Sequence, residues 1–347
     1  MSKLITNTIR HTGALSDSIT LTTDGTCTAE ITNRSNRNII INGAMNVAQR
    51  GTSDTSTDHF STVDRWSNTV SGLDENVTRS QESLSSSDTG PYEKGFRNAW
   101  KFVNGNQTSG AGAADYIIPQ YPIEAQDLAN SGWDYTDSDS KITLSFWVKS
   151  SVTQTFYAYI YTSDGTARAY SFSYDLSANT WTKVTKTIPG NSNITIDNNT
   201  GDGFRIYLPL FLGTDRTNSG NTLNTWAAYS GSNRTPDSTT TWYTTNDATW
   251  HLTGVQLEVG ATATDFEHKR FNDELRACQR YYCKTYAHGT VRGTETWEDM
   301  HGRQSDGGSN SYAGPGVWYY PGGEMRAKPT CVLYSKDGDT GKINIDN

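Results

Sequence analysis

Residues Trp250–Tyr286 read WHLTGVQLEVGATATDFEHKRFNDELRACQRYYCKTY. In the first part of this stretch, apolar and polar residues alternate with the period of two that is typical of a β-strand, and Gly260 ends the run. A strict alternation predicts two faces. One is formed by His251, Thr253, Val255, Leu257 and Val259, and the other by Trp250, Leu252, Gly254, Gln256 and Glu258.

The second part of the stretch predicts a short helix. Asn272 is a favourable N-cap, and Asp273 and Glu274 follow in the first turn, where negative charge suits the helix dipole. Leu275, Cys278 and Tyr282 then lie at i, i+3 and i+7, so they form one apolar stripe. We expect residues 271–286 to be a helical hinge after the last strand of a β domain.

Most of the chain before this stretch shows the pattern of short strands. Lys141–Lys149 is the clearest, with Ile142, Leu144, Phe146 and Val148 expected in the core. Further strands are expected at Arg97–Val103, Tyr116–Glu124 (read as an edge because of its prolines), Phe156–Tyr161, Tyr170–Tyr174, Trp181–Ile188 and Phe204–Leu212. Strands at this spacing, separated by turn residues, predict an all-β fold with an antiparallel sandwich. Residues 214–247 are expected to be a long ordered loop at one end of it.

Composition and charge exclude several classes of protein. The 347 residues carry a formal net charge of -8, which argues against a nucleic-acid partner. No apolar run approaches the length of a membrane helix, and Met1–Arg10 lacks the apolar core of a signal peptide. The four cysteines and six histidines show no disulfide or zinc spacing, so we expect free thiols and no cofactor.

Three stretches together resemble a known family. They are Asn38–Gly51 (NIIINGAMNVAQRG), Thr62–Trp66 (TVDRW) and Asp273–Tyr282 (DELRACQRYY), and the N-terminal segment adds to the match. They are similar to segments of structural proteins of tailed bacteriophages, in which a jelly-roll module resembling carbohydrate-binding modules precedes a helical segment. The resemblance implies a jelly-roll β-sandwich at residues 38–270 and a virion protein assembled in the host cytoplasm.

The two ends of the chain are expected to be separate units. Residues 1–37 have few large apolar residues, and are either an extended arm that docks on other virion proteins or a flexible tail. Residues 287–347 predict a small β unit, with short strands at Gly316–Tyr320, at Thr330–Tyr334 and around Ile343 and Ile345. Such a unit is marginal alone, so we expect it to pack with sister subunits, as a homotrimer by analogy with phage fibres.

Exposed aromatic rings are the candidate glycan-binding residues, because rings stack on the apolar faces of sugars. One set lies on a single strand and comprises Tyr157, Tyr159 and Tyr161; the other lies in the long loop and comprises Trp226, Tyr229, Trp242 and Tyr243. The alternative is that these rings fill a buried face or contact another subunit. That alternative is favoured for the strand set, both of whose faces are apolar.

Metal and catalytic signals are weak. Asp337 and Asp339 alternate with small residues as in a calcium loop, but a β-turn explains them equally well, and the acidic residues at 134, 137 and 139 are a similar case. No nucleophile, metalloprotease or phosphate-loop motif is found, so no catalytic residue is assigned. Asp64 with Arg65, and Glu258 with Arg270, are expected to be structural ion pairs.

The resemblance, taken with the N-terminal arm, the aromatic loop and the lack of catalytic motifs, favours a phage tail-fibre or receptor-binding protein that binds host surface glycans without cleaving them. A capsid decoration or cement protein would use the same arm and sandwich to clamp neighbouring shell subunits. A polysaccharide depolymerase is the third hypothesis, and would need a pair of carboxylates about 5–10 Å apart.

Overall fold

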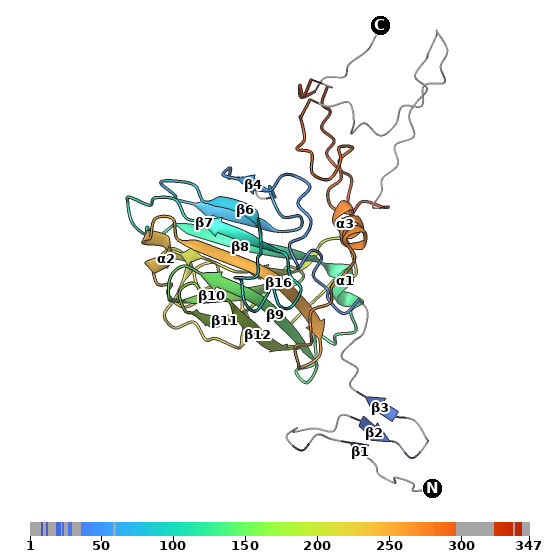
Figure 1. Cartoon of the computed structure of the whole chain (residues 1–347). Helices are drawn as coiled ribbons and strands as arrows, with labels where there is room; N and C mark the ends of the chain where they lie inside the picture. Colours follow the sequence, from blue (N-terminus) through green and yellow to red (C-terminus); the bar gives the residue numbers. More distant parts are fainter. Residues whose placement is uncertain are drawn as a thin grey trace, which may run out of the picture.

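Two antiparallel β-sheets face each other in a computed structural model of the chain (Figure 1). The structure describes residues 8–9, 12, 19–21, 23, 27–29, 36–57, 60–295, 323–335 and 337–341. The seven-stranded sheet contains β5 (Ser67–Ser71), β8 (Tyr116–Glu124), β10 (Gln154–Thr162), β11 (Arg168–Leu176), β13 (Asp202–Tyr207), β14 (Phe211–Leu212) and β15 (Trp226–Ala228). The six-stranded sheet contains β4 (Ser53–Asp54), β6 (Thr78–Ser83), β7 (Asn98–Val103), β9 (Lys141–Ser150), β12 (Thr182–Pro189) and β16 (Thr249–Val259).

The strand order is that of a jelly roll. Successive strands from β7 to β10, and again from β11 to β13, alternate between the two sheets; β14 and β15 stay in the sheet of β13, and β16 returns to the other. The central strands therefore lie in the order β7, β16, β9, β12 in one sheet and β8, β13, β10, β11 in the other. Two interleaved sets of four strands define this architecture, so the predicted jelly-roll sandwich is confirmed.

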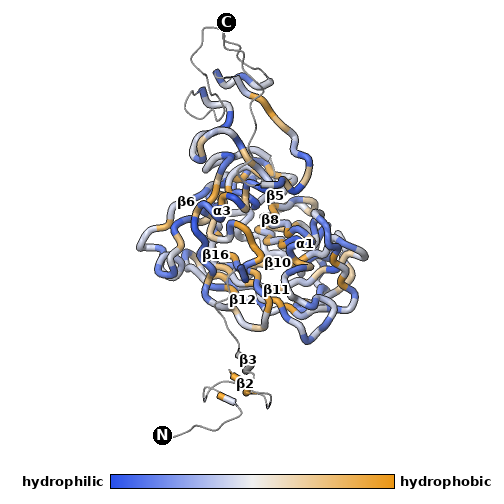
Figure 2. The backbone as a smooth tube through the Cα atoms, turned by 90° about the vertical axis from the view of Figure 1, so that its right-hand side faces the viewer, coloured by the Kyte–Doolittle hydropathy of each residue, from blue (hydrophilic) through white to orange (hydrophobic). Residues whose placement is uncertain are grey.

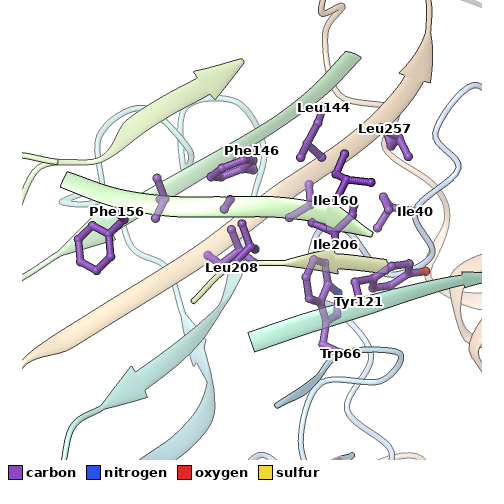
Figure 3. Packing of buried hydrophobic residues seen from close by; sticks show 14 of the residues in the cluster. Ile40, Trp66, Tyr121, Leu144, Phe146, Phe156, Ile160, Ile206, Leu208 and Leu257 are labelled. Carbon is purple, nitrogen blue, oxygen red and sulfur yellow. The ribbon is translucent and has the colours of Figure 1, made fainter. Parts of the chain in front are cut away.

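One continuous hydrophobic core lies between the sheets. Ile142, Leu144, Phe146 and Val148 of β9 all belong to it, which confirms the alternation expected for that strand. Figure 3 shows Leu144 and Phe146 facing Ile160 and Ile206 of the opposite sheet. Along the backbone, hydrophobic stretches gather within the sandwich and hydrophilic ones predominate in the loops around it (Figure 2).

The alternation expected for β16 is wrong beyond Gly254. The pairing register of β16 with β9 shifts between Thr253 and Gln256, which marks a β-bulge. As a result Trp250 and Leu252 face the core before the bulge, and Val255 and Leu257 face it afterwards. Gly254 adopts a φ of 63° at this point, a conformation that glycine adopts readily. A pattern with a strict period of two cannot represent the extra residue.

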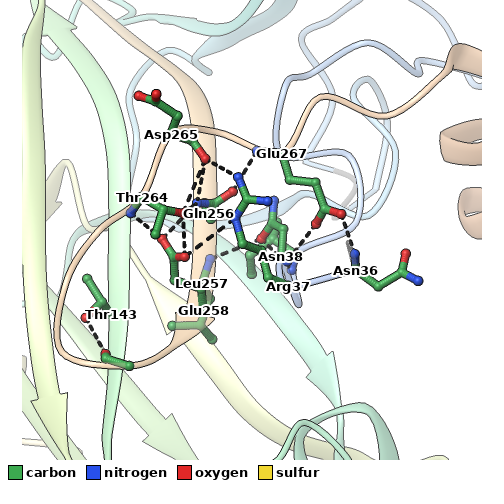
Figure 4. A network of polar contacts seen from close by, with 12 residues as sticks. Asn36, Arg37, Asn38, Thr143, Gln256, Leu257, Glu258, Thr264, Asp265 and Glu267 are labelled. Atoms are coloured by element: carbon green, nitrogen blue, oxygen red, sulfur yellow. Dashed lines mark hydrogen bonds and ion pairs between the residues drawn. The ribbon is translucent and has the colours of Figure 1, made fainter. Parts of the chain in front are cut away.

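The segment that follows Asn36 covers the edge of β16 that β7 leaves free. Pairing between β16 and β7 ends at Leu252. Beyond it, the amide of Ile39 donates to the Leu257 carbonyl at 2.9 Å, and the Asn38 side chain accepts from the Leu257 amide at 3.1 Å. Glu267 accepts from the Asn38 amide at 2.9 Å in the same network (Figure 4). The start of the sandwich is therefore tied to its last strand.

Several elements differ from the sequence-based expectation. β8 is an interior strand, since β5 pairs with one of its edges and β13, followed by β14, with the other. Phe204–Leu212 is divided into β13 and β14, and the long loop contains a 3-10 helix at Thr214–Arg216, β15 and α2 (Thr241–Thr244). The helix α1 (Ala125–Ala129) and the polar strand β6 were not expected, because neither of these two segments shows a clear apolar pattern.

The ends of the chain are described only in part. β1 (Thr8–Ile9), β2 (Ile19–Leu21) and β3 (Cys27–Ala29) form a small sheet of their own. The expected strands at 316–320 and 343–345 lie outside the described residues. Thr330–Tyr334 forms no strand, but Tyr334 makes an isolated bridge with Thr340. None of the described helices is both long and apolar enough to cross a membrane.

Replacing Gly254 by alanine is expected to destabilise the sandwich by about 2–3 kcal/mol, because a Cβ there would cause overpacking at a strained φ. That Cβ would lie 2.6 Å from Cζ of Phe96. Urea unfolding measures the loss. Gly231→Ala is the matched control, since a Cβ there meets open space; equal stability of the two variants would contradict the bulge.

Candidate functional site

A cleft of about 550 Å³ lies over the outer face of the seven-stranded sheet. Alternate residues of β8 face it, namely Tyr116, Ile118, Gln120, Pro122 and Glu124, while Ile117, Tyr121 and Ile123 face the core. Neighbouring strands contribute in the same way, with Ser67 and Thr69 from β5 and Arg205 and Tyr207 from β13. The alternation of an interior strand therefore provides the floor of the cleft.

Tyrosine rings line the outer end of the cleft. The rings of Tyr159 and Tyr207 are stacked with centroids 4.5 Å apart, and Tyr161 meets Tyr229 edge to face at 4.7 Å. Tyr159 is buried, whereas Tyr161, Tyr207 and Tyr229 are partly exposed. A second lobe of about 510 Å³ continues the cleft along Tyr161, Tyr207 and Tyr229. The buried ring thus supports a set of accessible ones.

Arginines stand among these rings. Arg216 lies over the ring of Tyr116 at 4.2 Å, and Arg234 over that of Tyr229 at 5.9 Å. Arg205 forms an ion pair with Asp202 on the same strand. Guanidinium groups next to aromatic faces combine cation–π contact with hydrogen-bond donors directed along the plane of the group. The outer end therefore offers both stacking surfaces and fixed donors.

The inner end of the cleft is closed by α3 (Phe271–Gln279) and the residues after it. Arg65 lies between two rings, 3.4 Å from the centroid of Tyr281 and 5.1 Å from that of Tyr121, and donates to the Pro122 carbonyl at 2.6 Å. Arg50 lies 3.6 Å from the ring centroid of Tyr282. These contacts join all three stretches that carry the family resemblance.

A buried carboxylate anchors the same junction. Glu124 is fully buried and accepts two hydrogen bonds from Arg280, at 2.6 and 3.1 Å, and one from the Tyr281 hydroxyl at 2.6 Å. Burial by itself raises the pKa of Glu124, but these hydrogen bonds outweigh it and lower that pKa below its ordinary value. Glu124 therefore remains ionised and its oxygens are already occupied.

The expected hinge is a docked segment. The helix begins at Phe271, with Arg270 at the N-cap position and no capping side chain, so the assignment of Asn272 as N-cap is wrong. Glu274, which accepts a hydrogen bond from the Asn42 amide, and Cys278 are buried. Leu275 is only partly buried and Tyr282 lies beyond the end of the helix. The buried face of the helix therefore carries the Glu274 carboxyl and the Cys278 thiol, and not the predicted apolar stripe.

Only some of the predicted glycan-binding rings line the cleft. Tyr161 and Tyr229 line the cleft, and Tyr159 lies beneath it. Tyr157 lies on the same strand but does not line either lobe. Tyr116 and Tyr207 were missed, although the alternation of β13 places Arg205 and Tyr207 on one face and could have indicated them.

The prediction that the loop aromatics bind glycan is wrong for three of the four. Trp242 and Tyr243 are fully buried: the Trp242 indole donates to the Thr249 carbonyl at 3.1 Å, and the Tyr243 hydroxyl to Asp115 at 2.9 Å. Trp226 is partly buried, packs against the core and donates to the Pro189 carbonyl at 2.7 Å. These rings close the end of the sandwich, so they are not available to stack on a ligand.

The remaining candidate residues make contacts within the fold. Asp339 lies in a turn that its hydrogen bonds with Ser335 close. No group of three metal-ligating side chains is found in the part of the chain that the structure describes, which includes Asp337 and Asp339. Two predicted ion pairs have other partners, since Asp64 pairs with Arg50 and Glu258 with Arg37, each at 3.7 Å. The sequence did not identify these partners because neither arginine is adjacent to its carboxylate along the chain.

No family model and no curated protein matches the sequence. Among solved structures, the enzymatically active domain of tailspike protein 4 from bacteriophage CBA120 is similar at 11% identity and a TM-score of 0.33, over 65% of this chain and 22% of that one. An N-terminal cellulose-binding domain from a Cellulomonas fimi β-1,4-glucanase is similar at 12% identity and a TM-score of 0.29, over 62% and 99%. A tandem CBM22 domain from Paenibacillus barcinonensis is similar at 9% identity and a TM-score of 0.31, over 69% and 50%. The jelly-roll assignment rests on the strand order, and not on these matches.

Arg280→Ala is expected to destabilise the protein by about 3 kcal/mol, because it leaves the buried Glu124 carboxylate without its cation. The depressed pKa of Glu124 means that the pair stabilises the fold above the unfolded-state pKa and that this stability is lost as the pH falls. The variant should therefore also show a flatter loss of stability on acidification. Urea unfolding at a series of pH values measures both effects, and Arg276→Ala, an exposed change on the same helix, is the control.

Proposed function

We propose that the chain is a non-catalytic glycan-binding structural protein of a tailed-bacteriophage virion, of the tail-fibre or receptor-binding type. The cleft over β8, β13 and β10 is the proposed binding site. The observation that carries the proposal is the set of partly exposed tyrosine rings, Tyr161, Tyr207 and Tyr229, in one cleft with arginine donors. Rings stack on the apolar faces of sugars while the donors bind hydroxyl oxygens.

The carboxylates of the cleft support binding without hydrolysis. A glycosidase needs a general acid with a raised pKa opposite a second free carboxylate. Glu124 and Asp202 are neighbours across β8 and β13, but Glu124 is buried with a lowered pKa and Asp202 is paired with Arg205. Asp64 has a pKa raised by burial, but it is enclosed by Arg50 and Gln49. Each of these carboxylates already has a structural partner.

The virion assignment rests on the resemblance of the three stretches and on how they pack. Arg50 and Arg65 come from the first two stretches, and they stack on Tyr282 and Tyr281 from the third. The stretches thus form one structural unit, as expected if they belong to a single family of modules. The N-terminal residues would dock on other virion proteins, and a homotrimer of sister chains remains part of the proposal.

Tyr229→Ala is expected to weaken polysaccharide binding about fivefold, because one aromatic contact contributes on the order of 1 kcal/mol. Binding is measured against an immobilised panel of mannan, phosphomannan, polygalacturonate and methyl-esterified polygalacturonate. Tyr157→Ala removes a ring of the neighbouring strand that lies outside the cleft, and should bind as the wild type does. If the wild type bound no member of the panel, the proposed function would be contradicted.

Antibody raised against residues 214–247 is expected to label the tail of intact virions in electron microscopy. This segment contains Tyr229 and two arginines of the cleft wall, together with many exposed residues. Label spread over the head would instead favour a capsid decoration protein, in which the same cleft would face shell subunits or the exterior.

A further inference from the structure

The charge of the cleft is opposite to that of the whole chain. The larger lobe is lined by six arginines, Arg50, Arg65, Arg205, Arg216, Arg234 and Arg326, and by three carboxylates, Asp64, Glu124 and Asp202. The whole chain, in contrast, carries a formal net charge of -8. Clefts with low-dielectric walls focus the field of the charges that line them. The cleft is therefore locally positive, although the chain as a whole is negative.

Part of this positive charge is neutralised by the fold and part is not. Arg50 pairs with Asp64, and Arg205 with Asp202. By contrast, Arg216, Arg234 and Arg326 form no ion pair with any residue that the structure describes. Arg326 lies beside Arg280 and close enough to Glu124 to lower the pKa of that carboxyl, whereas Arg216 and Arg234 lie at the outer end, next to the partly exposed tyrosines.

Arg216 and Arg234 are held in place by their own backbone. The amide of Arg234 donates to the Arg216 carbonyl at 3.0 Å, so the two residues lie side by side on neighbouring segments. Cζ of Arg216 lies over the ring of Tyr116 at 4.2 Å, and Arg234 donates through Nε to the Gly231 carbonyl at 3.1 Å. Stacking occupies the face of a guanidinium and leaves its edge for a planar or tetrahedral oxyanion.

We infer that the ligand of this cleft is an anionic saccharide, one that carries carboxylate or phosphate groups; this inference rests on the proposed glycan-binding function. The tyrosines stack on sugar rings, and Arg216 and Arg234 bind the acidic substituent through paired N–H donors. A neutral glycan would leave two adjacent cations desolvated without a counter-charge, which is unfavourable in a partly enclosed site.

A purely structural role for the two arginines makes a different prediction. If they only packed against Tyr116 and Tyr229, replacing both would expose ring surface and lower the stability of the fold. If they serve an anionic ligand, removing two adjacent unpaired cations should leave stability unchanged or raised while binding is lost. Stability and binding therefore separate the two roles.

The test measures affinity for two matched pairs, phosphomannan against mannan and polygalacturonate against its methyl ester. Each pair keeps the sugar backbone and removes the charge. We expect at least tenfold tighter binding to one or both charged members, weakened by added salt because exposed charges are screened. Preference for polygalacturonate alone would identify carboxylate as the recognised group, and preference for phosphomannan alone would identify phosphate.

The double variant Arg216→Gln, Arg234→Gln should lose this preference and unfold no earlier than the wild type. Arg276→Gln, on the exposed side of α3, should keep the preference. Equal affinity of the wild type for charged and neutral members would overturn the inference and leave the proposed glycan binding standing. Binding to none of the four would overturn both, and unchanged preference in the double variant would exclude these arginines as the recognition groups.

Discussion

Buried charge between the first loops and the last helix holds the two ends of the sandwich together. Arg65 lies between the rings of Tyr121 and Tyr281, and Glu124 is fully buried between Arg280 and Tyr281. Removing Arg280 would leave the Glu124 carboxylate in the interior without its counter-charge, which costs several kcal/mol. The position of α3, and with it the inner wall of the cleft, depends on these contacts.

The cleft combines a rigid floor with walls from distant parts of the sequence. Its floor is an interior strand, β8, whose two faces serve the core and the cleft in turn. Its outer wall comes from the long segment that contains Arg216, Tyr229 and Arg234, and its inner wall from the residues after α3. Loops carried on a fixed sheet are a common way to build a binding site. The proposed selectivity for anionic sugars belongs to the outer wall alone.

Sequence patterns predicted the exposure of aromatic rings on a strand better than that of rings in a loop. A run of tyrosines on one strand correctly indicated the face to which Tyr161 belongs, because side chains alternate along a strand. The same reasoning could not separate Tyr229, which lines the cleft, from Trp242, which closes the core. Both lie in a polar loop, and only the packing of that loop on the sheet decides which ring water can reach.

The sequence by itself determined the β-sandwich, the positions of most strands and the helix near residue 275, because these follow from local periodicity and turn residues. It also identified the three stretches that pack around Arg65. The tertiary structure decided the rest: the bulge at Gly254, the ion-pair partners of Asp64 and Glu258, and the gathering of arginines in an acidic chain. Each depends on contacts between residues far apart in the chain, and local sequence carries no record of those distances.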